Sequence, residues 1–90
     1  SYISQFCNKL DLDKQAIVIS EDIVRQAMSM GISSGKGPTG IAAAAIYIAS
    51  VKVGKPRTQK EIARISGVTE VTIRNRYKEI SKALNISISE

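Results

Sequence analysis

The chain has 90 residues, a net charge of +5, a single cysteine and no histidine. This length suffices for one domain and excludes two large lobes. With one cysteine and no histidine, a structural zinc site, a Cys/His nucleophile pair and a Ser/His/Asp triad are all excluded within these residues. No apolar run reaches the roughly 18 residues that span a bilayer, and no segment resembles a signal peptide, so we expect no membrane insertion. Because Cys7 can form no internal disulfide, we expect a reducing compartment.

The excess positive charge is confined to the second half of the chain. Residues 1–45 carry four bases and four acids, whereas residues 46–90 carry nine bases and four acids. A one-sided basic field in a small domain favours a polyanionic partner, with nucleic acid ahead of an acidic membrane surface. A solvated lysine-rich face is the alternative, and charge alone does not separate the two.

Apolar residues in the first thirty positions recur at the spacing of helix faces. Residues 16–19 are rich in β-branched side chains and would favour a strand if taken alone. We nevertheless predict a helix there, because the flanking pattern continues for three further turns. The two predicted stripes consist of Ile3, Phe6, Cys7 and Leu10, and of Ala16, Ile19, Ile23, Ala27 and Met30.

A third helix is predicted after the glycine-rich segment 31–40, which is typical of a loop. Pro38 suits the first turn of a helix, where its missing N–H costs nothing. Residues 41–49 are apolar on every side, so this helix has no face to leave in water. It is too short to span a membrane and is therefore predicted to lie in the centre of an all-α bundle.

The last third of the chain predicts two short helices joined by a tight turn. Thr58 and Glu61 match a capping box, in which each side chain accepts a hydrogen bond from the other residue's backbone N–H. Gly67 can adopt positive φ, and Thr69 can cap the following helix. The predicted elements are a helix to about Ser66, a turn at Gly67, and a helix from about Glu70 to Leu84.

The spacing of Ala63, Gly67 and Ile73 is that of a helix-turn-helix. A small residue is needed where the two helices cross, a glycine at the turn, and a branched apolar residue where the second helix returns to the core. Apolar supporting positions are occupied by Ile62, Ile65 and Val68. We therefore predict an all-α orthogonal bundle of five helices, with a helix-turn-helix over residues 58–84.

The final helix is predicted to have two distinct faces. An exposed valine at the head of a stripe with basic and amide side chains suits a recognition helix, because arginine can bond guanine and valine can pack against a thymine methyl. A solubilising surface is the alternative. The inward stripe is Ile73, Tyr77, Ile80 and Leu84, and the outward stripe is Val71, Arg74, Asn75, Lys78 and Lys82.

Two long segments, GKGPTGIAAAAIYIAS and RTQKEIARISGVTEVTIRNRYKEI, carry a family resemblance. They resemble the second cyclin-like repeat of the transcription factor B / transcription factor IIB core, most closely its archaeal form. The resemblance runs from Ile3-Ser4-Gln5-Phe6-Cys7 to about Leu84, and residues 85–90 are expected to be a loose tail. It implies a five-helix cyclin-like fold for residues 1–84, whose last two helices form the helix-turn-helix.

The resemblance also implies a function. In that family the repeat docks in the major groove on the B recognition element, just upstream of the TATA box, in a complex with TATA-binding protein. Contacts to RNA polymerase would be made by parts outside this chain. The expected location is the archaeal cytoplasm, at the nucleoid, or the nucleus of a eukaryote. Matched positions imply base readout by Val71 and Arg74 beside Thr69, Thr72 and Asn75, and phosphate contacts by Lys36, Arg57 and Lys60, joined by Lys78 from the basic stripe.

Two other classes of function remain as alternatives. Cyclin-like bundles also bind helices or peptides, so the basic stripe could instead meet an acidic protein partner. Residues 31–37 superficially suggest a phosphate loop, but the segment is one residue short, lacks Ser or Thr after Lys36, and follows a helix. The acidic pairs Asp11/Asp13 and Glu21/Asp22 are interpreted as helix-start charges. We therefore expect no catalysis and no cofactor.

Overall fold

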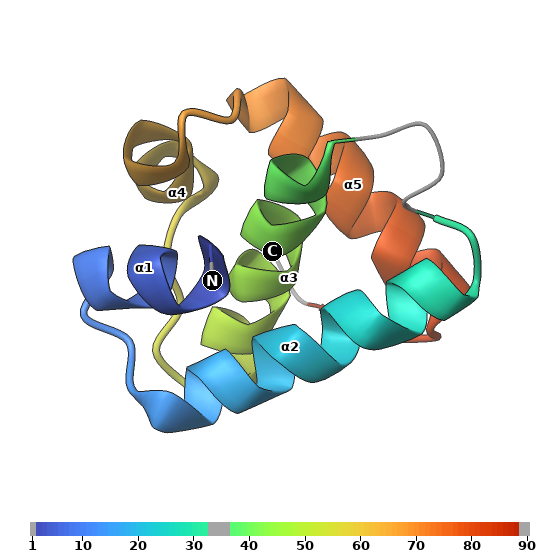
Figure 1. The fold of residues 1–90 in the computed structure, drawn as a ribbon, viewed down its shortest axis with the longest axis horizontal. Coiled ribbons are helices and arrows are strands. Elements are labelled where there is room, and N and C mark those ends of the chain that lie inside the picture. Colours follow the sequence, from blue (N-terminus) through green and yellow to red (C-terminus); the bar gives the residue numbers. More distant parts are fainter. Residues whose placement is uncertain (1, 33–36, 89–90) are drawn as a thin grey trace.

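The computed structural model describes residues 2–32 and 37–88, which form five helices and no strand (Figure 1). The predicted all-α architecture is thereby confirmed. None of the helices in this described part combines the length and apolarity needed to cross a bilayer. The helices are α1 (Tyr2–Lys9), α2 (Lys14–Ser29), α3 (Pro38–Lys52), α4 (Gln59–Ser66) and α5 (Glu70–Ala83).

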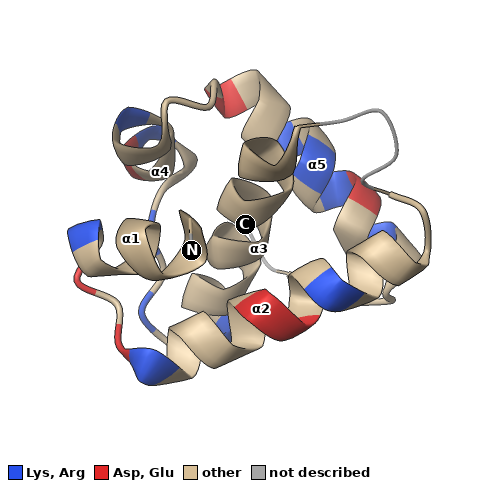
Figure 2. Cartoon of the chain, in the orientation of Figure 1, with Lys and Arg blue, Asp and Glu red and all other residues tan. Residues whose placement is uncertain are grey.

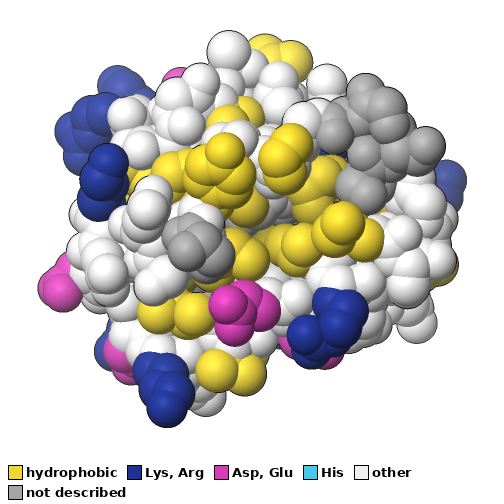
Figure 3. Space-filling model, viewed as in Figure 1, with side chains coloured by type: hydrophobic (Ala, Val, Ile, Leu, Met, Phe, Trp, Pro, Cys, Tyr) yellow, Lys and Arg dark blue, Asp and Glu magenta, His cyan; other side chains and the backbone are white. Residues whose placement is uncertain are grey.

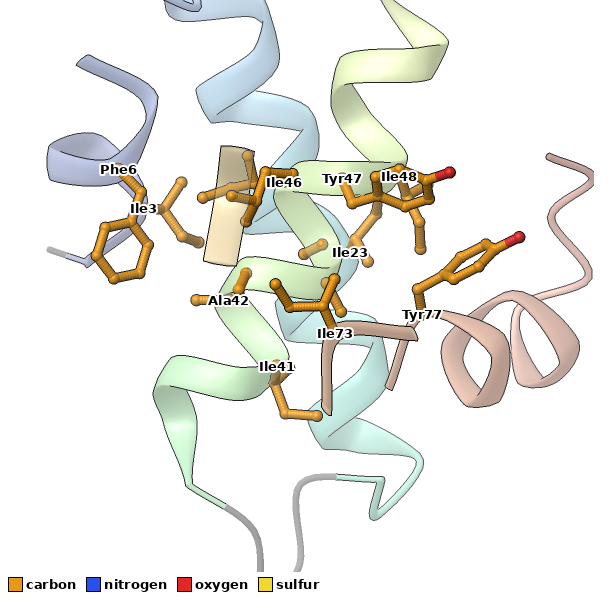
Figure 4. Packing of buried hydrophobic residues seen from close by; sticks show 14 of the residues in the cluster. Ile3, Phe6, Ile23, Ile41, Ala42, Ile46, Tyr47, Ile48, Ile73 and Tyr77 are labelled. Atoms are coloured by element: carbon orange, nitrogen blue, oxygen red, sulfur yellow. The ribbon is translucent and has the colours of Figure 1, made fainter. Parts of the chain in front are cut away.

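Helix α3 is the centre of the molecule, as predicted. Every residue from 41 to 50 is buried, and α3 contacts all four of the other helices. Figure 4 shows side chains from α1, α2 and α5 converging on it. The run of alanines explains this arrangement, because small side chains let neighbouring backbones approach closely from several directions. The segment 31–40 is not a loop throughout, since α3 begins at Pro38.

The amphipathic stripe of α1 is confirmed, and that of α2 is confirmed in most of its length. The segment 16–19 is helical, and Ala16, Ile23 and Ala27 of α2 are buried while Ile19 is partly buried. In α1 and just beyond it, the buried residues are Ile3, Phe6, Cys7 and Leu10.

The prediction of a buried Met30 is wrong. Met30 follows the last turn of α2 and its side chain is 54% exposed. Gly31 then adopts φ +77°, which turns the chain so that the N–H of Ile32 bonds the carbonyl of Ala27 at 3.0 Å. Ile32 is buried in place of Met30, because the helix-end turn and not the helix period decides which side chain points inward.

The expectation of a loose C-terminal tail is wrong for residues 85–88. Asn85 takes a left-handed conformation, and the N–H of Ile86 bonds the carbonyl of Ser81 at 2.9 Å. Ile86 and Ile88 are partly buried against the core. This segment therefore extends the packed domain beyond α5.

Candidate nucleic-acid interface

Helix α4 begins at the predicted capping box. The Thr58 hydroxyl accepts a bond from the N–H of Glu61 at 3.0 Å, and Glu61 Oε1 accepts from the N–H of Thr58 at 2.9 Å. The backbone bond from Thr58 lowers the pKa of Glu61 below its ordinary value, with a further contribution from the Thr58 hydroxyl. The carboxylate is thus held in its charged form and turned toward the start of its own helix.

The turn between α4 and α5 also has the predicted form. Gly67 ends α4 with φ +75°, and its N–H bonds the carbonyl of Ala63 at 3.0 Å. Thr69 caps α5, because its hydroxyl oxygen accepts from the N–H of Thr72 at 3.2 Å. Its hydroxyl also donates to the Thr72 hydroxyl oxygen at 3.0 Å. The hydrogen bonds between Thr69 and Thr72 therefore fix the first turn of α5.

Helix α5 divides into an inner and an outer face. Ile73, Tyr77 and Ile80 are buried and Leu84 is partly buried, as the inward stripe predicted. The Tyr77 ring meets that of Tyr47 edge-on, with 4.9 Å between ring centroids, and both rings are labelled in Figure 4. This packing anchors α5 on the central helix. The outer face is exposed and carries Val71, Arg74, Asn75, Lys78 and Lys82.

The predicted exposure of Val71 on that face is confirmed. Its side chain is 56% exposed at the front of α5, where an apolar group gains nothing from contact with water. Helix α5 carries two acids, Glu70 at its first residue and Glu79, which is paired with Arg76 at 3.2 Å. The positive charge of the stripe itself is left unneutralised by that pair.

Most of the predicted contact residues are exposed on α4, α5 and the cap of α5. Thr69, Thr72, Asn75 and Lys78 lie exposed on the first three turns of α5 and its cap, and Lys60 is exposed on α4. Lys36 lies outside the described residues. Helices α4 and α5 both carry Lys and Arg residues, and Figure 2 shows them on either side of the α4–α5 turn.

Arg57 has an internal role that the sequence did not reveal. Its Nε donates to the carbonyl of Leu10 at 2.8 Å and its Nη1 to that of Lys55 at 3.0 Å, while Nη2 lies 3.4 Å from the Asp11 carbonyl. The guanidinium thus ties the end of α1 to the segment that precedes α4. The phosphate contact predicted for Arg57 stays a prediction, and it would have to form alongside these bonds.

Sequence reasoning did not single out two positions near the candidate interface. Arg64 is exposed on α4, one turn beyond Lys60, and the charge pattern of residues 60–64 could have indicated it. Gly40 lies where α3 crosses α5, and a Cβ placed there would be 3.3 Å from Cγ2 of Thr72. No sequence signal distinguishes this glycine from those of the preceding loop, because the close approach depends on tertiary packing.

No group of three or more His, Cys, Asp or Glu side chains that could hold a metal occurs among the described residues. Burial raises the pKa of the Cys7 thiol to about 11, so it is not a ready nucleophile. Asp13 directly precedes α2, as a helix-start charge would, and contacts Lys55 at 3.2 Å. Glu21 and Asp22 lie in the middle of α2, so their interpretation as helix-start charges is wrong.

The fold and this surface together define a class, a small all-α domain that ends in a helix-turn-helix with a basic outer face. The family model described as "Transcription factor TFIIB repeat" matches residues 1–83. The chain therefore belongs to the TFIIB repeat family, which confirms the resemblance at that level.

Curated relatives agree with this assignment. The whole chain is 99% identical to part of "Transcription initiation factor IIB 2" of Thermoplasma volcanium, of which it covers 29%. It is 53% identical over 89 residues to "Transcription initiation factor IIB 1" of the same organism, covering 28% of it. It is 54% identical over 87 residues to "Transcription initiation factor IIB" of Methanosarcina mazei, covering 26%. The chain thus spans less than a third of the length of each of these relatives.

Proposed function

We propose that this chain is a sequence-reading DNA-binding module of a general transcription initiation factor, without catalytic activity of its own. The front of α5 enters the major groove on the B recognition element, upstream of the TATA box, in a complex that contains TATA-binding protein. Other parts of the parent protein contact RNA polymerase. The archaeal relatives support a location at the nucleoid, in the cytoplasm.

The observation that carries this proposal is the outer face of α5. A half-exposed valine at the head of a basic and amide-bearing stripe offers both apolar contact and hydrogen-bond donors to base edges. Val71 and Arg74 are the proposed base-reading residues, because an N-terminal position on the second helix reaches deepest into the groove. The residues beside them are Thr69, Thr72 and Asn75.

Phosphate contacts supply register and most of the affinity in this proposal. Lys60 and Lys78 flank the reading residues and are both exposed. The complete proposed set is Lys36, Arg57, Lys60 and Lys78. A single module makes few contacts, and TATA-binding protein raises its local concentration on the promoter.

Arg74→Ala tests base readout directly. We expect a loss of about 1–3 kcal/mol in binding to the matched upstream sequence and a weaker preference at one base pair. Lys78→Ala should weaken binding to matched and scrambled sequences alike. Gel-shift titration of both variants in the complex with TATA-binding protein measures these effects.

Equal losses for Arg74→Ala on matched and scrambled sequences would contradict base readout. Complex assembly that is insensitive to sequence upstream of the TATA box would favour the other candidate function, a cyclin-like protein-interaction module that makes no base contacts.

A further inference from the structure

Helix α4 presents two exposed cations. Lys60 and Arg64 are spaced four residues apart, so they lie on one face of the helix, and both are exposed. Neither has a hydrogen-bond or ion-pair partner among residues 2–32 and 37–88. Dark blue side chains project at the edge of the molecule where α4 lies (Figure 3).

The only acidic residue of α4 does not pair with these cations. Glu61 Oε1 accepts bonds from both the N–H and the hydroxyl of Thr58, at 2.9 and 3.1 Å. Its carboxylate is therefore engaged at the start of the helix and forms no ion pair with either base, although the charge of Arg64 contributes to lowering its pKa. The two cations keep their hydrogen-bond donors available for an external anion.

An open depression of about 570 Å³ connects these cations to the front of α5. Ala63 and Val68 contribute its apolar lining. Its charged lining consists of Lys60, Arg64 and Glu61, and the Glu61 carboxylate is bonded to Thr58. Thr69, the cap of α5, also lines it. A ligand that combines an anionic group with an apolar sugar surface fits this lining, and a DNA backbone has that composition.

The position of α4 relative to α5 indicates which part of the DNA the cations of α4 would contact. The Lys and Arg residues of α4 and those of α5 lie on opposite sides of the α4–α5 turn (Figure 2). The major groove is about 12 Å wide and is bordered by a row of phosphates on each side. The domain measures 29 × 25 × 23 Å, so it exceeds the width of the groove in every direction.

We propose that Arg64, together with Lys60, binds a backbone phosphate on one side of the major groove, while the basic stripe of α5 binds phosphates on the other side. Arg64 is then a DNA contact in its own right and acts as a positioning residue that fixes the docking angle of α5. This inference rests on the proposed function, because it assigns a second contact surface to the same DNA complex.

The salt dependence of binding tests the contact. For Arg64→Gln in the promoter complex, we expect several-fold weaker binding and a slope of log K against log salt that is smaller by about 0.9, the value for one lost phosphate contact. The loss should be equal on matched and scrambled upstream sequences. Lys14→Gln is the matched control, because it removes one exposed charge at the far end of the molecule from the α4–α5 turn (Figure 1).

Substituting single phosphates by uncharged methylphosphonates locates the contact. We expect the effect of Arg64→Gln to vanish when one particular phosphate is neutralised, and the effect of Lys78→Gln to vanish for a phosphate on the opposite side of the groove. An unchanged salt slope for Arg64→Gln, or the same phosphate for both variants, would overturn the proposal.

Two further outcomes separate this inference from the proposed function. Normal sequence preference in the unmodified chain, with no effect of Arg64→Gln on DNA binding but weaker capture of TATA-binding protein, would assign the depression to a protein partner and overturn only the phosphate contact. An unmodified chain with no preference for the upstream sequence would overturn the proposed function itself, and the phosphate contact with it.

Discussion

Helices α3 and α5 have nearly the same length, 15 and 14 residues, but they meet their surroundings in opposite ways. Helix α3 buries ten consecutive residues, whereas α5 buries three and leaves a continuous outer stripe in solvent. The composition of α3 is therefore decided by packing alone. Packing constrains the residues of α5 on its inner side only. The residues on its outer side can therefore be selected for binding.

The strongest test of this contrast is a pair of truncations, one in each helix. Ile46→Ala removes a fully buried side chain of α3, and we expect unfolding free energy to fall by about 2–5 kcal/mol through lost burial and the resulting cavity. Val71→Ala on the outer face of α5 should change it by less than about 0.5 kcal/mol. Urea denaturation of both variants measures the difference, and similar losses would refute the division of roles.

A smaller effect is expected where the end of α3 meets the segment that leads to α4. The buried Ser50 hydroxyl donates to the carbonyl of Tyr47 at 2.8 Å and accepts from the N–H of Arg57 at 3.1 Å. Ser50→Ala leaves that N–H without its acceptor, and we expect a loss of about 1–3 kcal/mol. Thermal unfolding should show a much smaller shift for Ser29→Ala, whose hydroxyl is exposed and bonds only a carbonyl of its own helix.

The smallest of these effects concerns the start of α4. Thr58→Ala removes the capping box, and we expect a loss of about 0.5–2 kcal/mol, whereas Thr58→Ser retains the hydroxyl and most of the stability. Chemical denaturation of the two variants checks this difference.

The same cap makes stability depend on pH. Because folding lowers the pKa of Glu61, its contribution is present above the pKa of the unfolded chain and is lost as pH falls through the lower folded value. In Glu61→Gln, the free energy of unfolding should fall less steeply with decreasing pH below about pH 5. Denaturation curves recorded at a series of pH values measure this. An unchanged pH dependence in this variant would show that other carboxylates determine the loss of stability at low pH.

The elements that depend on local chemistry were predictable from the sequence. The capping box, the left-handed turn at Gly67 and the two faces of α5 each follow from a few neighbouring side chains, and the structure confirms all three. The buried α3 followed from the absence of any polar face. These features need no knowledge of what lies across the fold.

The features that sequence reasoning missed depend on contacts between distant segments. Arg57 bonds carbonyls near residue 10, and Ile86 and Ile88 return to the core after a left-handed turn at Asn85. Neither pairing leaves a periodic or local pattern. For the candidate interface, the sequence predicted the contact residues of α5, but whether they touch DNA is decided by the binding experiments described above.

The crossing at Gly40 has a consequence for how a partner is accommodated. The Thr72 methyl group faces a glycine hydrogen there, while the Thr72 hydroxyl and N–H are held by Thr69. The side chains of Thr72 and Arg76 on α5 thus pack directly on the backbone of α3, because Gly40 places no side chain of its own between them. In the proposed complex the DNA would then deform to fit the protein, because α5 is packed directly against α3. DNA sequences whose groove widens or bends easily would be favoured, even at base pairs that the protein does not touch.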